Sequence, residues 1–544
     1  MRWERPAGHL LFALAGAVLL AVGWILALAP PGRSIGTFAG DDAGYYLGIA
    51  RNHALGYGYS FDRLHATNGF NPLLPWMLIG VFRLLPARLP LEACYHVSVL
   101  IGFVAVLVGL VPYLRMLAAA LDPRAFAGGS RHLALGAGAA FYSLFIATKG
   151  YYGMDAPLVL ALGLLYAWRV HRHGPLAPGF AAAAIDGALL GLAFLARVDT
   201  LPLIAAAFAV MALEAAASRR GAGALAARLA VVALVCLPYV AWSTARFGTW
   251  LPVSARLKSS FPVVHLSESL RVLRFTSLHV VDQGSFVVAF LLAIGTAVAF
   301  GRHAIGSLRA RTPLEPRRAA LGLLALYLIG RFTFMLLFSR GDVQGSYAIL
   351  AHVFSVLVLA EAASALALRA AGAGRAASPI PAAMALGLAL LSLVLFAGKV
   401  RATAGPWSRA AGAPDEVSLG REIHALTGPG DVLYGGTFGL LGYFSDRAWI
   451  NLDGVVNTYA YQRVFIEPGS RGEGGLADYL EANHVSHVVT IVPADYDPGP
   501  GPVRLSAWGI LYDRKNEFEV WPADIVLRRP APGGGILWVV RYRP

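Results

Sequence analysis

Two adjacent carboxylates, Asp41 and Asp42, lie shortly after the first long apolar run, residues 10–29. Ionised side chains beside a membrane span are costly unless they are paired or have a function. A carboxylate there can act as a general base toward a hydroxyl group, or bind a divalent cation such as Mg²⁺ or Mn²⁺. A helix cap before Ala43 explains Asp42 equally well. We predict that Asp41 and Asp42 are catalytic, and that Asp42 is also a candidate metal ligand.

A second group of candidate residues lies in the segment 247–260. Lys258 is one of four lysines in the chain, and with Arg256 it places two cations beside several serines. This composition suits a phosphate group, although Arg and Lys beside Trp250 are also typical membrane-interface anchors. Arg331 lies inside a later apolar run and should therefore face a polar cavity. Lys258, Arg256 and Arg331 are our predicted phosphate-binding residues.

The elements that must position these residues are membrane helices. The chain of 544 residues is 57% hydrophobic and 14% charged, with a mean hydropathy of +0.60. Such values are typical of a polytopic α-helical membrane protein. The net charge of +14 comes from basic residues between apolar runs, where they set membrane orientation. We therefore expect membrane lipids as surroundings and no nucleic acid as a partner.

Eleven apolar runs are long enough to cross a bilayer. They are residues 10–29, 93–117, 133–148, 155–170, 180–196, 200–217, 227–245, 284–300, 319–338, 345–368 and 379–398. A cytoplasmic N-terminus places the arginine-rich segments inside, and the first loop and the tail outside. The stretch 72–85 is short, so we expect a helix on or re-entering the outer interface, with a twelfth span as the alternative.

The same patterns predict two domains. Residues 1–399 form a membrane domain whose first outer loop is 30–92, and residues 400–544 form an outer-face α/β domain. An Ala/Gly/Pro-rich linker, 402–414, precedes the tail. Within the tail we expect helices and strands at 416–426, 431–434, 475–483 and 485–492.

Two further charged positions fall on the expected outer face. Asp155 opens the fourth apolar run just before Pro157, an arrangement that also suits a helix N-terminus. Arg197 and Asp199 lie in the turn between the fifth and sixth runs, where a charge pair bridging two helices is an alternative to a site.

The segment from Asp41 to Leu73 resembles the first outer loop of the GT-C superfamily of membrane glycosyltransferases. The resemblance is to bacterial relatives of protein O-mannosyltransferases and aminoarabinose transferases. It is carried by the acidic pair, by the aromatic and polar residues after it, and by a motif that ends at Leu73. The residues after the acidic pair are Tyr45, Tyr46 and Ile49–Asn52, and the motif consists of Thr67–Phe70 and Asn71–Leu73. The usual His-Pro-Pro-Leu element of that superfamily is present only as Asn71-Pro72-Leu73.

This resemblance implies a sugar donor linked to polyprenyl phosphate and a catalytic or metal-binding acid at Asp41 or Asp42. Asp155 resembles the second outer-loop acid of the superfamily and is a candidate metal ligand. Arg197 with Asp199 resembles its Arg-x-Asp turn. Residues 449–457 resemble a tail element that could contact the acceptor, although a strand followed by an Asp-Gly turn explains them equally well. The predicted substrate-binding residues are Tyr45, Tyr46, Asn68, Asn71, Asp155 and Arg197.

The sequence thus predicts a glycosyltransferase of the bacterial inner membrane, with a cytoplasmic N-terminus and a periplasmic tail. It would move a sugar, with inversion, from a polyprenyl-phosphate carrier to a glycan, lipid or protein acceptor of the cell envelope. The alternative is a transporter or flippase of a lipid-linked or small polar substrate. A transporter site should hold ionisable groups near the membrane midplane, whereas the conspicuous acids here lie outside. A scaffold that presents the tail to a partner leaves the acidic pair and Lys258 unexplained.

Overall fold

The computed structural model describes most of the chain. The described residues are 4–35, 38–85, 89–126, 129–147, 150–218, 222–264, 280–340, 349–372, 415–436, 438–466, 476–496, 501–507, 516–531 and 534–543, with the single residues 383, 387 and 499.

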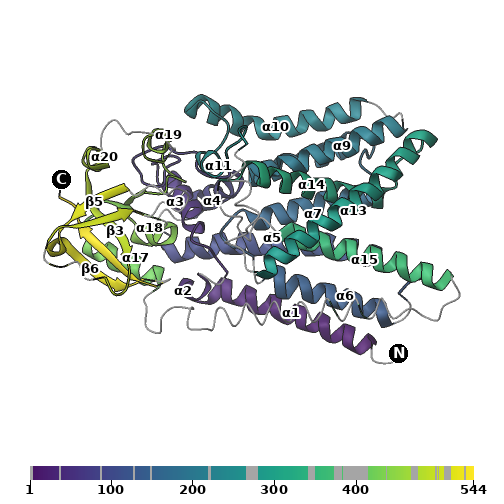
Figure 1. Ribbon diagram of the computed structural model, residues 1–544, viewed down its shortest axis with the longest axis horizontal. Helices are drawn as coiled ribbons and strands as arrows, with labels where there is room; N and C mark the ends of the chain where they lie inside the picture. The colour runs from purple at the N-terminus through teal and green to yellow at the C-terminus, as the bar shows by residue number, and fades with distance from the viewer. Residues whose placement is uncertain are drawn as a thin grey trace.

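Long helices lie side by side and form a bundle (Figure 1). They are α1 (Glu4–Leu28), α5 (Leu91–Ala120), α6 (Gly129–Phe141), α7 (Ala156–His173), α8 (Phe180–Ala196), α9 (Leu201–Ser218), α10 (Ala222–Phe247), α13 (Val280–Ala310), α14 (Pro316–Phe338) and α15 (Ile349–Gly372). A π-helical turn, Tyr142–Ala147, continues α6. Among the described residues, seven helices are long and apolar enough to cross a membrane.

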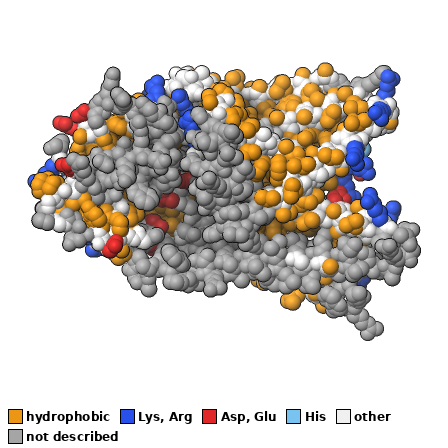
Figure 2. Space-filling view, viewed as in Figure 1, with side chains coloured by type: hydrophobic (Ala, Val, Ile, Leu, Met, Phe, Trp, Pro, Cys, Tyr) orange, Lys and Arg blue, Asp and Glu red, His pale blue; other side chains and the backbone are white. Residues whose placement is uncertain are grey.

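Each of the first ten predicted spans overlaps an observed helix, but α6, α7 and α8 are not among the seven described helices that are long and apolar enough to cross a membrane. The eleventh, residues 379–398, lies outside the described residues, as do the linker 402–414 and the domain boundary at 400. On the face that Figure 2 shows, the described surface of the bundle is largely apolar, and Lys and Arg side chains gather at its end farthest from the tail. An apolar belt with a basic rim at one end is the surface expected of a membrane protein.

Four short helices lie between the bundle and the tail: α2 (Pro31–Ser34), α3 (Ala43–Ala54), α4 (Leu73–Leu84) and α11 (Val253–Lys258) (Figure 1). Helix α4 packs against α3 and α8. Its 12 residues extend about 18 Å, which is shorter than the roughly 30 Å of a hydrocarbon core. The segment 72–85 is thus a short helix, as the sequence predicts for an interfacial segment.

The tail contains a five-stranded sheet in the order β2-β1-β3-β7-β6. These strands are β1 (Val432–Gly435), β2 (Ala448–Asn451), β3 (Val485–Val492), β6 (Ile525–Pro530) and β7 (Ile536–Arg541). Strand β1 runs parallel to β2 and β3, whereas β7 is antiparallel to β3 and β6. A separate antiparallel pair joins β4 (Val503–Ala507) and β5 (Asn516–Val520).

Helices complete the tail: α17 (Glu416–Leu426), α18 (Gly439–Ser445), α19 (Tyr459–Tyr461) and α20 (Leu476–Ala482). Helix α18 connects β1 to β2 and packs against α3 of the first loop. At this crossing an added Cβ at Gly44 would lie 2.0 Å from the Gly439 backbone. Glycine at Gly44 therefore lets the two helices approach closely. The carboxyl ends of β1 and β2 face the first loop, because Gly439 after β1 bonds Asp41 and Asn451 at the end of β2 bonds Tyr45.

Candidate active site

Asp42 lies at the entrance to α3 and is partly exposed. It immediately precedes Ala43, but its side chain makes no capping hydrogen bond, so the capping interpretation is wrong for this residue. Its Oδ2 atom is 4.0 Å from Nζ of Lys258. The two side chains are 35% and 32% exposed, so both are within reach of a substrate. The structure thus brings together two residues that are more than 200 positions apart in the sequence.

The neighbouring carboxylate, Asp41, has a different environment. Its two oxygens accept hydrogen bonds from the backbone N–H groups of Gly439 (2.8 Å) and Leu440 (3.0 Å), at the start of α18. Burial raises the pKa of Asp41 to about 7, against the opposing effect of these two hydrogen bonds. Asp41 therefore attaches the first loop to the tail, while Asp42 remains available beside Lys258.

Lys258 is held at the end of α11 by contacts on both sides. The backbone N–H of Val253 donates to Oδ1 of Asn68 at the start of the helix. At its end, the N–H of Arg340 donates to the Lys258 carbonyl at 2.9 Å, and the N–H of Ser260 donates to Phe338. The end of α14 thus fixes the backbone on which Lys258 is carried.

Asn68 is completely buried. Its Nδ2 donates to Ser243 Oγ at 2.8 Å and to the Leu251 carbonyl at 3.1 Å. With its oxygen bound to Val253, this amide fixes the segment before Lys258, and we interpret it as a positioning residue. Arg256, predicted to bind phosphate, lies over the ring of Tyr459 from the tail, with Cζ 5.8 Å from the ring centre.

A buried polar network surrounds Asp155. Its Oδ2 accepts hydrogen bonds from Tyr46 Oη and from Asn71 Nδ2, both at 2.6 Å. Its Oδ1 accepts from Arg197 at 2.9 Å. The Asp155 side chain makes no cap on α7, so the helix-cap interpretation is wrong here as well. Four predicted substrate-binding residues thus meet, and they contact one another through buried hydrogen bonds.

The same network continues to Arg331. Arg197 forms two hydrogen bonds to the Asp199 carboxylate, each 3.0 Å long. Arg331 donates to the carboxylate and to the backbone carbonyl of Asp199, at 3.1 Å and 3.2 Å. The predicted charge pair in the turn between α8 and α9 is confirmed, and it binds α14 to that turn.

The tail adds a further carboxylate, Asp453, two residues after β2. It is 5% exposed, and its Oδ1 accepts a hydrogen bond from the N–H of Val455 at 3.1 Å. Tyr45 Oη donates to its Oδ2 at 3.4 Å. Gly454 has a φ of 80°, which confirms the predicted Asp-Gly turn. Burial raises the pKa of Asp453 to about 6, with Asp42 adding to the rise and Lys258 opposing it.

Sequence reasoning missed an ion-pair cluster between the first loop and the tail. Arg51 donates to Asp446 Oδ1 at 2.7 Å, and Arg63 pairs with the same carboxylate. Asp446 has a φ of 49°, in the left-handed region at the end of α18. Because its partners are almost 400 residues away, no local pattern marks Asp446. The cluster holds the tail against the loop that carries Asp42.

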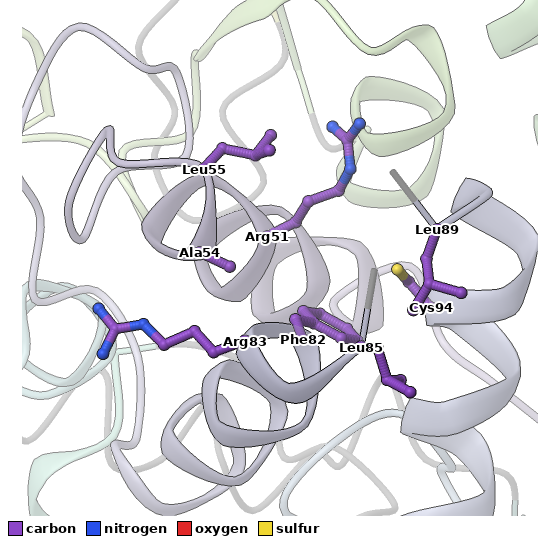
Figure 3. A pocket seen from close by; sticks show the side chains of 8 residues that line it. All are labelled: Arg51, Ala54, Leu55, Phe82, Arg83, Leu85, Leu89 and Cys94. Atoms are coloured by element: carbon purple, nitrogen blue, oxygen red, sulfur yellow. The ribbon is translucent and has the colours of Figure 1, made fainter. Parts of the chain in front are cut away.

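A cavity of about 160 Å³ lies close to the first loop, among α3, α4 and the start of α5 (Figure 3). It is lined by Arg51, Ala54, Leu55, Phe82, Arg83, Leu85, Leu89 and Cys94. These residues are mostly apolar, and neither Asp42 nor Lys258 is among them. The cavity is therefore distinct from the candidate site.

The donor set does not fit the predicted divalent cation between Asp42 and Asp155. A cation needs several oxygen ligands that converge on it. Both Asp155 oxygens already accept hydrogen bonds, and an ammonium group stands beside Asp42. Across the described ranges, no three His, Cys, Asp or Glu side chains converge as a metal site requires.

Comparison with known proteins adds a likeness of fold. No family model matches the sequence, and no curated protein matches it. Among solved structures, ArnT from Cupriavidus metallidurans bound to undecaprenyl phosphate aligns with a TM-score of 0.52 and 14% identity, over 97% of both chains. This chain therefore shares its fold with that ArnT. The apo state of the same ArnT aligns with a TM-score of 0.51, also at 14% identity over 97% of both chains.

A third solved structure is the archaeal oligosaccharyltransferase AglB from Archaeoglobus fulgidus, in complex with an inhibitory peptide and a dolichol-phosphate. It aligns with a TM-score of 0.47 and 13% identity, over 88% of this chain and 69% of that chain. The fold shared with ArnT confirms the predicted fold class, a helical membrane bundle followed by a C-terminal α/β domain. In this chain the fold places α3, α11 and the tail around the Asp42–Lys258 pair.

Proposed function

We propose that this chain is a glycosyltransferase that moves a sugar from a polyprenyl-phosphate carrier to a hydroxyl group of a cell-envelope acceptor. The observation that carries the proposal is the pair of Asp42 and Lys258, whose side chains are about one-third exposed and whose charged atoms are 4.0 Å apart. One group can accept a proton and the other can hold a phosphate. The fold shared with an ArnT that was solved with undecaprenyl phosphate supports this class of donor.

In the proposed reaction Asp42 accepts the proton of the acceptor hydroxyl. The acceptor oxygen forms a bond to the anomeric carbon, and the bond from that carbon to the carrier phosphate breaks. The phosphate leaves with the bonding electrons, and Lys258 stabilises its charge. Attack opposite the leaving group inverts the configuration of the sugar. Asp42 is preferred over Asp41 as the base because both Asp41 oxygens bind α18.

We place the reaction at the outer face of a bacterial inner membrane. In this arrangement residues 1–399 form the membrane domain, the N-terminus is cytoplasmic and residues 400–544 form a periplasmic domain. The Lys and Arg side chains at the bundle end opposite the tail support this orientation (Figure 2), because cytoplasmic segments carry the basic excess. The acceptor is a glycan, a lipid or a protein of the envelope.

The test uses the purified protein in lipid nanodiscs with a panel of radiolabelled undecaprenyl-phosphate hexoses and pentoses. Envelope glycan, lipid and protein fractions serve as acceptors, and release of undecaprenyl phosphate is the readout. We expect release that depends on both donor and acceptor. Saturable binding of undecaprenyl phosphate without transfer from any donor would contradict the proposal and favour carriage of the lipid.

A further inference from the structure

The carboxyl edge of the parallel strands is one of the parts of the tail that meet the first loop. Asn451 is the last residue of β2, and Asp453 follows in the next turn. In open sheets of this kind, binding residues gather beyond the carboxyl ends of parallel strands. Helix α3 brings Tyr45 to that edge, where the Asn451 Nδ2 donates to Tyr45 Oη at 2.9 Å. Tyr45 in turn donates to Asp453.

The Asn451 side chain supplies a second, independent observation. It is 2% exposed, and its Oδ1 has no hydrogen-bond partner in the part of the chain that the structure describes. Leaving a buried acceptor unsatisfied costs about 1–3 kcal/mol. Native proteins retain few such groups, and those retained call for an explanation such as a catalytic role. In the group formed by Tyr45, Asn451 and Asp453, the Oδ1 atom of Asn451 is thus an acceptor without a hydrogen-bond donor.

The charges around Asp453 are those of the proposed reaction. Asp42 and Lys258 both act on its carboxyl group, with opposite effects on the pKa. The other titratable groups that interact with it are Tyr45 of α3, Tyr434 of β1 and Tyr461 of α19. A carboxylate enclosed in this way changes the electric field at its charged neighbours whenever it gains or loses its proton.

We propose that Asp453 of the tail is a positioning residue of the transfer site, which holds Tyr45 and sets the charge around Asp42 and Lys258. This inference rests on the proposed function. It makes the tail a part of the active site, because the first loop alone lacks this carboxylate. The role is one of positioning, since Asp453 is buried and acts through its neighbours.

The test compares Asp453→Asn with Asp446→Asn, which alters a tail carboxylate at the same junction but outside the site. Transfer from the donor that the wild type uses is measured against pH in nanodiscs. We expect Asp453→Asn to lose roughly 10- to 100-fold in kcat. An inflection of the wild-type profile near pH 6, where Asp453 takes up its proton, should be absent from the profile of Asp453→Asn. Asp446→Asn should lower Tm without moving the profile.

Binding of undecaprenyl phosphate gives a second readout that needs no turnover. Removing the negative charge of Asp453 should tighten binding of the anionic phosphate at Lys258. An unchanged profile together with unchanged binding in folded Asp453→Asn overturns the inference. If that variant does not fold, Tyr45→Phe decides, because loss of the hydroxyl donor disfavours the charged form of Asp453 and should move the inflection near pH 6 to higher pH.

The two proposals fail in different ways. Absence of transfer by the wild type from every donor contradicts the proposed function, whereas tighter undecaprenyl phosphate binding by Asp453→Asn would still support a place for Asp453 beside Lys258. Transfer by the wild type with an unchanged profile and unchanged binding in the variant contradicts only the role of Asp453.

Discussion

Two groups of charged residues come from the same set of sequence predictions, yet their surroundings differ. Asp42 and Lys258 are about one-third exposed and 4.0 Å apart. Asp155 and Arg197 are 1% and 10% exposed and are joined by a 2.9 Å ion pair. The first pair stands at the junction of loop and tail, and the second is enclosed between helices. Exposure thus separates residues that can meet a substrate from residues that hold the framework.

The enclosed network has equal positive and negative charge, which explains how it persists in a poorly solvated place. Asp155 and Asp199 balance Arg197 and Arg331. A buried ion pair of this kind adds little stability by comparison with apolar packing, but breaking it leaves a charge without compensation. The network therefore fixes how α7, the turn after α8, and α14 meet.

The largest expected effect is on stability and comes from Arg197→Met. This change leaves the buried Asp155 carboxylate without its cationic partner, and we expect a loss of about 3–5 kcal/mol in unfolding free energy. Thermal unfolding in nanodiscs measures it. The double variant Asp155→Asn, Arg197→Met should recover part of the loss. Equal stability of Arg197→Met and wild type would remove the distinction between the two groups.

Lys258→Gln should act on ligand binding and leave stability nearly unchanged. Loss of a charge-assisted contact to phosphate costs about 1.5–3 kcal/mol, equivalent to roughly 10- to 150-fold weaker binding of undecaprenyl phosphate. Lys258→Arg should retain part of the affinity. If Lys258→Gln bound undecaprenyl phosphate as tightly as the wild type, other cations, such as Arg256, would have to bind the phosphate.

Gly44→Ala tests whether the tail must dock closely on α3. An added Cβ would meet the Gly439 backbone at 2.0 Å, and such overpacking costs about 1–3 kcal/mol. Gly80→Ala in α4 is the matched control, because an added Cβ there meets nothing within 4 Å. We expect lower Tm and weaker transfer for Gly44→Ala alone. Equal Tm and equal transfer activity of the two variants would show that α3 and α18 can move apart without loss of stability or function.

A further effect is a pH dependence of stability that comes from Asp41. Its pKa is raised from 3.8 to about 7 in the folded state, so its contribution to stability is fully present below about pH 4 and is lost as the pH rises through 7. The Tm of the wild type relative to Asp41→Asn should therefore fall between pH 4 and pH 8. A difference that grows with pH would show that the hydrogen bonds from α18 outweigh burial.

Much of the fold follows from sequence patterns, because long apolar runs and short alternating segments are local signals. Strand β3 has the bounds that were predicted, 485–492, and α17 has its predicted bounds, 416–426. The first loop was recognisable as a site because its acids and amides are concentrated in a short segment.

The different roles of Asp41 and Asp42 could not be predicted from the sequence. Asp41 and Asp42 are identical in type and adjacent, so no pattern separates them. Their difference arises because the two side chains of the turn before α3 lie in different directions, toward α18 in one case and toward Lys258 in the other. The partner Gly439 is almost 400 residues from Asp41, and Asp453 is more than 400 residues from Tyr45. Only folding of the tail onto the loop decides these contacts.

The most direct test compares the two neighbouring aspartates in one assay. Undecaprenyl phosphate release is measured for wild type, Asp42→Asn and Asp41→Asn at a temperature where all three are folded. The account predicts a loss of roughly 10²- to 10⁴-fold in kcat for Asp42→Asn, with a change in stability within about 0.5 kcal/mol, and a much smaller loss for Asp41→Asn. Full activity of Asp42→Asn, or a greater loss for Asp41→Asn, would contradict the assignment of Asp42 as the base.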